Sequence, residues 1–134
     1  MSKKYEAMVL SCIDPRFQKP VHKHLKDKKL TGKFSAFTIA GGSIGVTNNK
    51  FKKWHSTFWE NLETSINLHK INKLIVLNHN DCGAAKIANN NKNFNSRIEI
   101  AIHKKSFNKI KKTLKKKFPK IKVSFKILSL KNAL

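Results

Sequence analysis

The chain has 134 residues, which is enough for one domain and too few for two domains of ordinary size, so we expect a single domain over residues 1–134. Lysine and arginine number 29 against 7 aspartate and glutamate residues, a formal net charge of +22, and 40% of the residues are hydrophobic. This composition excludes a disordered chain, and the absence of a long apolar run excludes a membrane-spanning protein.

The basic excess consists almost entirely of lysine, since only Arg16 and Arg97 are arginines. Together with abundant asparagine, this composition is typical of an AT-rich coding bias. Arginine is the side chain that binds bases and phosphates through two parallel hydrogen bonds, so its scarcity makes specific nucleic-acid binding unfavoured. A basic nucleic-acid-binding module that uses the lysines of residues 104–122 stays open as an alternative and predicts strongly salt-dependent binding.

The first third of the chain predicts two strands with a helix between them. The apolar run 5–11 predicts a buried strand, and Pro15 forces the chain to leave the sheet soon after it. A helix is expected over 16–30, with Val21 and Leu25 on one face and Gly32 near its end. The run 34–40 predicts a second strand, followed by a tight loop at residues 41–43.

The rest of the chain alternates helices and strands in the same way. Apolar residues at helical spacing predict a helix over 49–70, and the run 74–77 predicts a buried central strand. A short helix is expected from Gly83, then an asparagine-rich loop at 89–95 and a basic helix over 96–118, with Ser96 as a candidate N-cap and Pro119 at its end. A last strand is expected over 121–130, and residues 131–134 form a short tail.

This order of elements predicts an α/β domain with a small, mainly parallel sheet flanked by helices. In such sheets, ligands bind beyond the carboxyl ends of the strands. Three predicted strands are followed directly by Cys12, by Gly41-Gly42 and by His79 with Cys82, so we expect these residues to meet at one edge of the sheet.

The two cysteines and one histidine of this group are the donor types that bind zinc. Three protein ligands leave one coordination position open, which is typical of a catalytic zinc site, whereas a structural site has four. We also expect the start of the helix at Gly83 to favour the thiolate form of Cys82. The remaining histidines lie among lysines in predicted helices and are expected to be surface residues: His22, His24, His55, His69 and His103.

Asp14 and Arg16 complete the group of candidate functional residues. Asp14 lies two residues after Cys12 and faces the expected metal if this stretch is extended. Arg16 can hold its carboxylate with two hydrogen bonds and keep it away from the metal. The segment Asp14-Pro15 is equally compatible with a simple turn or helix start.

The motifs Cys12-Ile13-Asp14-Pro15-Arg16 and His79-Asn80-Asp81-Cys82-Gly83, with Ala40-Gly41-Gly42 between them, resemble the signature of the β-class carbonic anhydrases. The resemblance covers about the first two-thirds of the chain. It implies Zn²⁺ bound by Cys12, His79 and Cys82, an Asp14–Arg16 dyad that controls the fourth position, and reversible hydration of CO2 to bicarbonate by a zinc-hydroxide mechanism. It also implies a homodimer or higher homo-oligomer.

Within that interpretation, backbone N–H groups of Gly41, Gly42 and Gly83 are candidate binders of product oxygens. We expect a small apolar pocket for CO2, lined by Ile13, Phe17 or Ile44. The alternatives are a zinc protein with weak or different activity, such as hydrolysis of carbonyl sulfide or carbon disulfide, and a redox dithiol formed by Cys12 and Cys82. The N-terminal residues lack the apolar segment of a signal peptide, so a cytoplasmic location is expected.

Overall fold

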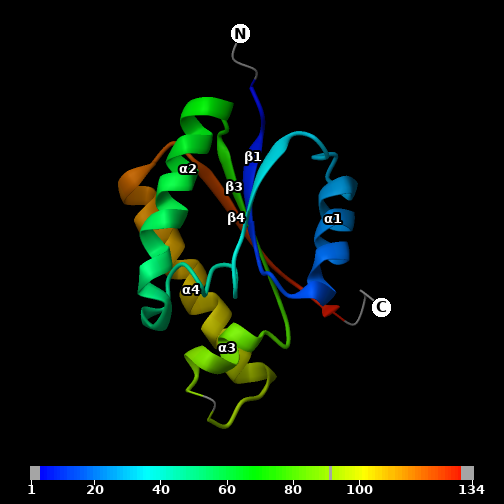
Figure 1. Cartoon of the computed structure of the whole chain (residues 1–134), viewed down its shortest axis with the longest axis vertical. Helices are drawn as coiled ribbons and strands as arrows, with labels where there is room; N and C mark the ends of the chain where they lie inside the picture. Colours follow the sequence, from blue (N-terminus) through cyan, green and yellow to red (C-terminus); the bar gives the residue numbers. More distant parts are fainter. Residues whose placement is uncertain (1–3, 91, 131–134) are drawn as a thin grey trace.

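A four-stranded parallel sheet forms the centre of the fold in the computed structural model, which describes residues 4–90 and 92–130 (Figure 1). Its strands, in the spatial order β2-β1-β3-β4, are β2 (Phe34–Thr38), β1 (Ala7–Ser11), β3 (Lys73–His79) and β4 (Lys122–Leu128). Every strand pairing in the sheet is parallel, which confirms the predicted fold class.

The two central strands carry the most apolar sequences. All five residues of β1 are buried, and β3 is buried from Leu74 to His79. A strand covered by helices on both faces needs a continuous apolar run, which explains the lack of alternation in both sequences. The edge strand β4 alternates exposed and partly buried residues instead, because only one of its faces is covered.

Helices cover the two faces of the sheet unequally (Figure 1). Helix α1 (Gln18–Asp27), preceded by the 3₁₀ turn η1 (Pro15–Phe17), lies on one face, and α2 (His55–His69) and α4 (Ser96–Lys117) lie on the other. The 3₁₀ turn η2 (Asn49–Trp54) leads into α2, and the short α3 (Gly83–Ala88) follows β3. Phe58, Leu62 and Ile110 fill the core on the two-helix side, whereas Phe17, Val21 and Leu25 fill it on the side of α1.

Several predicted boundaries were wrong by a few residues. The first helix ends at Asp27 rather than residue 30, because Lys29 adopts a left-handed φ of 60°. The predicted strand 34–40 ends at Thr38, and the strand predicted at 74–77 runs on to His79. Asn95, not Ser96, caps α4, because its side-chain oxygen accepts the Ile98 N–H at 2.9 Å. The predicted tail 131–134 lies outside the described residues.

No helix within residues 4–90 and 92–130 is long and apolar enough to cross a membrane. The longest, α4, has 22 residues, but lysines recur along it from Lys104 to Lys117.

Packing around Phe58 of α2 provides a test of the core. Phe58 is fully buried, and its ring meets the ring of Phe37 on β2 edge-to-face at 5.4 Å. Phe58→Ala should lower the free energy of unfolding by about 3–5 kcal/mol, because it removes a buried ring and leaves a cavity. Urea denaturation measures this, with Leu68→Ala as control. Leu68 lies on the same helix but is 64% exposed, so its truncation should change stability by less than about 0.5 kcal/mol.

Candidate metal centre

Parallel pairing of β1 with β3 brings together segments that are far apart in the sequence. Ser11, the last residue of β1, pairs with Leu77 of β3. Cys12 follows Ser11 directly, and His79 is the last residue of β3. The chain then turns through Asp81, whose φ of 54° is left-handed, and Cys82 begins α3 as its N-cap. The topology therefore places both His79 and Cys82 beside Cys12.

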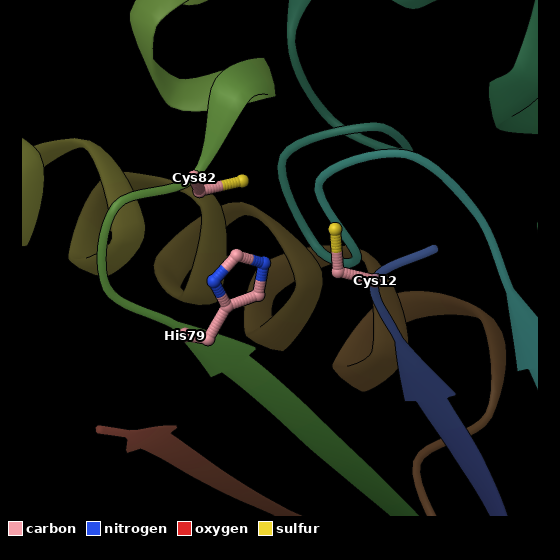
Figure 2. A group of neighbouring side chains, drawn as sticks. All are labelled: Cys12, His79 and Cys82. Carbon is pink, nitrogen blue, oxygen red and sulfur yellow. The ribbon is translucent and has the colours of Figure 1, made fainter. Parts of the chain in front are cut away.

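The side chains of Cys12, His79 and Cys82 converge at this point (Figure 2). Each offers one ligand atom, and these atoms all lie within 4.8 Å of one another. All three residues are buried, with exposed fractions of 4%, 0% and 1%. Around a tetrahedral zinc ion with ordinary bond lengths, ligand atoms lie roughly 3.5–4 Å apart. A small inward movement of the side chains thus suffices to enclose a metal ion.

The orientation of His79 fits a metal ligand. Its Nδ1 donates to the backbone carbonyl oxygen of Asn80 at 2.6 Å, which leaves a lone pair on Nε2. That Nε2 is buried and has no hydrogen-bond partner among the described residues. A buried polar atom without a partner is costly, and a metal ion would satisfy it. The ring of Phe17 packs against the imidazole, with 4.7 Å between ring centroids.

The two thiols differ in acidity because they interact with each other. A hydrogen bond from Cys82 is the main cause that lowers the pKa of Cys12, and the Gly41 N–H, 3.3 Å from its Sγ, lowers that pKa further. The same pairing with Cys12, together with burial, raises the pKa of Cys82. The N–H groups of Ala85 and Ala84 act in the expected direction on Cys82 but are outweighed. The contacts of the metal-free site therefore favour the thiolate form of Cys12, and the start of α3 does not offset the effect of Cys12 on Cys82.

His79 responds to the same environment. Burial lowers the pKa of its imidazole, but the neighbouring Cys12 sulfur and the Asn80 carbonyl oxygen outweigh burial, so the pKa is raised overall. In the site without metal, the lowered pKa of Cys12 favours an anionic sulfur, and the raised pKa of His79 favours a second proton on its Nε2. A divalent cation would bind Nε2 in place of this second proton, while Nδ1 still donates to the Asn80 carbonyl oxygen.

Asp14 and Arg16 form the bidentate pair that the sequence indicated. Arg16 Nη2 lies 2.8 Å from Asp14 Oδ2, and Arg16 Nε lies 3.1 Å from Asp14 Oδ1. The Arg16 guanidinium lowers the pKa of Asp14, so this carboxyl is ionised at neutral pH. Asp14 Oδ2 also lies 3.8 Å from His79 Nε2, so the carboxylate faces the three ligand residues. Asp14 caps η1 as well, by accepting the Arg16 backbone N–H at 2.9 Å.

Arg16 also reaches the loop after β3, which carries Asp81 and Cys82. It donates to Asp81 Oδ2 at 3.0 Å and to the Asp81 carbonyl oxygen at 3.1 Å. Arg16 and Lys86, which lies 3.1 Å from Asp81 Oδ1, lower the pKa of Asp81. One guanidinium therefore ties the loop after β1 to the loop after β3.

A cleft of about 510 Å³ opens beside the three ligand residues, and its walls are mostly apolar. Its lining comprises Cys12, Ile13, Asp14, Pro15, Ala40, Gly41, Phe51, Trp54, Gly83, Ala84 and Ile87. Ile13 lines it as expected, but Phe17 and Ile44 do not, because both side chains are fully buried in the core. Neither Phe51 nor Trp54 lies in a motif that the sequence singles out. Their rings stack at 4.9 Å and form one wall of the cleft.

The glycine loop supports Cys12 rather than presenting free N–H groups to the cleft. The Gly41 N–H donates to Cys12 Sγ, and the Gly42 N–H donates to the Ile39 carbonyl oxygen at 3.0 Å. Both glycines have left-handed φ values, 78° and 55°, and a side chain at Gly42 would meet Asn78 Oδ1 at 2.8 Å. Gly41 and Gly83 form part of the cleft wall.

Two buried residues behind the site, Glu99 and His103, belong to none of the motifs found in the sequence. The expectation that His103 lies on the surface was wrong, since its side chain is 0% exposed. Its spacing of four residues from Glu99 could have indicated a pair on one helix face. Among the described residues, the group that could hold a metal ion comprises Cys12, His79 and Cys82. His22 and His24 do not belong to this group; His22 is exposed and His24 is partly buried.

The fold is that of the β-carbonic anhydrases. The chain is similar to the β-carbonic anhydrase CafA of Aspergillus fumigatus, with a TM-score of 0.65 and 12% identity over 98% of this chain and 74% of the other. It is also similar to a carbonic anhydrase from Streptococcus mutans, with a TM-score of 0.56 and 18% identity over 99% of this chain and 81% of the other. Residues 1–125 match the family described as "Putative carbonic anhydrase", and the chain belongs to that family.

Two relatives from Rickettsia are more similar to this chain in sequence than the two solved structures are, and both are described only as uncharacterized proteins. The relative from Rickettsia conorii is 32% identical over 87% of this chain, and the one from Rickettsia bellii is 31% identical over 87%. The aligned region spans 63% of the Rickettsia conorii protein and 71% of the Rickettsia bellii protein.

The interaction between the thiols predicts a measurable change in acidity. In the metal-free protein, the Cys12 thiolate should form well below the ordinary pKa of a cysteine, seen as ultraviolet thiolate absorbance during a pH titration. Cys82→Ala removes the S–H donor, so the Cys12 pKa should rise toward its ordinary value. Cys12→Ser is the control and should remove the low-pH absorbance. An unchanged Cys12 titration in the Cys82→Ala variant would contradict the assignment.

Proposed function

We propose that this protein is a zinc-dependent carbonate dehydratase, which catalyses the reversible hydration of CO2 to bicarbonate. The observation that carries the proposal is the convergence of one ligand atom each from Cys12, His79 and Cys82 within 4.8 Å, together with the buried Nε2 of His79, which has no hydrogen-bond partner among the described residues. Two sulfurs and one imidazole nitrogen suit Zn²⁺ and leave a fourth position for solvent. Membership of the carbonic anhydrase family and the β-carbonic anhydrase fold support the same assignment.

Each proposed role follows from where the side chain lies. Zinc bound here would supply a Lewis acid that lowers the pKa of a coordinated water molecule. Asp14, ionised and 3.8 Å from His79 Nε2, is placed to accept a hydrogen bond from that water and to orient it. Arg16 holds both carboxylate oxygens of Asp14 and so restrains the carboxylate from binding the metal itself.

The adjoining cleft suits a small apolar substrate. The side chains of Ile13, Phe51 and Trp54 offer CO2 a surface on which water binds weakly. The same apolar, aromatic wall favours carbonyl sulfide and carbon disulfide, so hydrolysis of these linear molecules is the second candidate activity. The glycine N–H groups suggested for product binding have less support. Those of Gly41 and Gly42 already donate to Cys12 Sγ and the Ile39 carbonyl oxygen.

Two other interpretations explain fewer of the residues. A Cys12–Cys82 dithiol would use the adjacent sulfurs but leave His79 Nε2 buried without a partner. A nucleic-acid-binding module would use the lysines of α4 but leave Asp14, Arg16 and the Cys/His group without a role.

We further propose a homodimer or higher homo-oligomer. Ile13 and Ile87 line the cleft and are 57% and 45% exposed, so a second copy would cover them. A cytoplasmic location also stays a prediction.

Metal analysis of the purified protein, joined to a stopped-flow assay of CO2 hydration, tests the central proposal. We expect one zinc per chain and hydration activity that disappears after chelation and returns with added zinc. Parallel assays with carbonyl sulfide and carbon disulfide identify the preferred substrate. A zinc content near zero, with reversible disulfide formation instead, would favour the dithiol interpretation.

Asp14→Ala separates metal binding from catalysis. The variant should keep its zinc, because Asp14 is not one of the three ligands, but its hydration rate should fall by roughly 10²-fold or more, the usual effect of losing a positioned acid–base group. Asp27→Ala on α1 is the matched control and should keep full activity. Unchanged activity in the Asp14→Ala variant would rule out the role given to this carboxylate.

A further inference from the structure

We infer that Glu99, on the first turn of α4, is a positioning residue that holds the metal-binding loop of His79 and Cys82 in its ligating conformation and thereby sets the zinc affinity. This inference rests on the proposed zinc site. Glu99 lies seventeen residues after Cys82 in the sequence and outside both recognised motifs. Its carboxylate is nevertheless buried directly behind the loop, with a side-chain exposure of 7%.

The carboxylate binds two consecutive backbone N–H groups of the loop. Asp81 N donates to Glu99 Oε1 and Cys82 N donates to Glu99 Oε2, both at 2.9 Å. Asp81 has a left-handed φ of 54°, a conformation that is uncommon outside glycine, although aspartate adopts it more readily than most residues. Such a conformation persists when its surroundings hold it in place. Glu99 supplies that restraint at the residue that aims Cys82 toward Cys12.

A second layer of buried side chains fixes the orientation of Glu99. Asn78 Oδ1 accepts the Ser43 N–H at 3.3 Å, so the Asn78 amide nitrogen faces His103 Nδ1 at 2.7 Å. His103 Nδ1 is therefore an acceptor, and Nε2 carries the proton that His103 donates to Glu99 Oε2 at 3.2 Å. Glu99 thus faces donors only: two backbone N–H groups and one imidazole N–H.

The same network reaches the segments around all three ligand residues. Asn78 directly precedes His79, and its amide nitrogen also donates to Ser43 Oγ at 2.7 Å. Ser43 belongs to the glycine loop in which Gly41 donates to Cys12 Sγ. Ser43 Oγ in turn lies 2.6 Å from Ser106 Oγ on α4. Helix α4 therefore anchors the backbone around each ligand without contributing a ligand of its own.

An isosteric substitution tests this role. In Glu99→Gln, the side chain keeps its shape but can present only one acceptor oxygen, so its amide NH2 must face at least one of the three donors. The zinc affinity of the folded variant, measured by competition with a chromophoric chelator, should fall 10- to 100-fold, the usual effect of removing a partner that orients metal ligands. The Co²⁺-substituted variant should also show altered thiolate-to-cobalt and d–d absorption bands.

Matched variants separate positioning from a general effect on the fold. Glu63→Gln on the exposed surface of α2 makes the same change of charge and should leave both readouts unchanged. Glu99→Asp keeps the charge but shortens the side chain, so it should also weaken zinc binding. This variant replaces Glu99→Gln in the test if Glu99→Gln does not fold. Lower thermal stability with unchanged zinc affinity and cobalt spectrum would overturn the inference and leave the zinc site intact. A wild-type protein that binds no zinc would overturn both proposals.

Discussion

Pairing of two central parallel strands is the constraint on which the candidate site depends. Because β1 and β3 run side by side in the same direction, with Ser11 opposite Leu77, their carboxyl ends deliver Cys12 and His79 to the same edge of the sheet. Apolar runs with no alternation make both strands central, so the hydrophobic effect that buries them also brings the ligands together. The candidate ligand residues are buried as a result and contact one another. These contacts lower the pKa of Cys12 and raise that of His79, although burial by itself acts in the opposite direction on both groups.

Much of this arrangement could be predicted from the sequence, because strongly apolar runs and special residues are local signals. The parallel α/β class and the neighbouring positions of Cys12, His79 and Cys82 followed from apolar runs that end at these residues. Boundaries were less accurate: the capping role of Asn95 and the left-handed turn at Lys29 depend on backbone geometry. The spacing of Glu99 and His103 could indicate a pair on one helix face, but their contacts with the Cys82 loop and Asn78 form only after distant elements pack, as does the place of Trp54 in the cleft.

The site combines rigid and exposed parts. The three ligand residues and the network behind them are buried and hydrogen-bonded to backbone, an arrangement that holds side-chain orientations closely. The face that opens to the cleft instead carries Ile13 and Ile87, which are exposed in the single chain. This division resembles other sites in which a fixed scaffold bears the reacting groups and a more variable surface selects what approaches.

The ion cluster at the mouth of the site has a consequence for how this lysine-rich chain responds to dissolved salt. Arg16 joins Asp14 to Asp81, and Lys86 joins the same Asp81, yet Arg16 and Asp81 are about half exposed. Counterions weaken attraction between such exposed charges, and they equally weaken repulsion among the many lysines elsewhere. Rising ionic strength therefore stabilises the domain as a whole, while it weakens the link between the loop after β1 and the loop after β3. Global stability and local order at the mouth should respond to ionic strength in opposite directions.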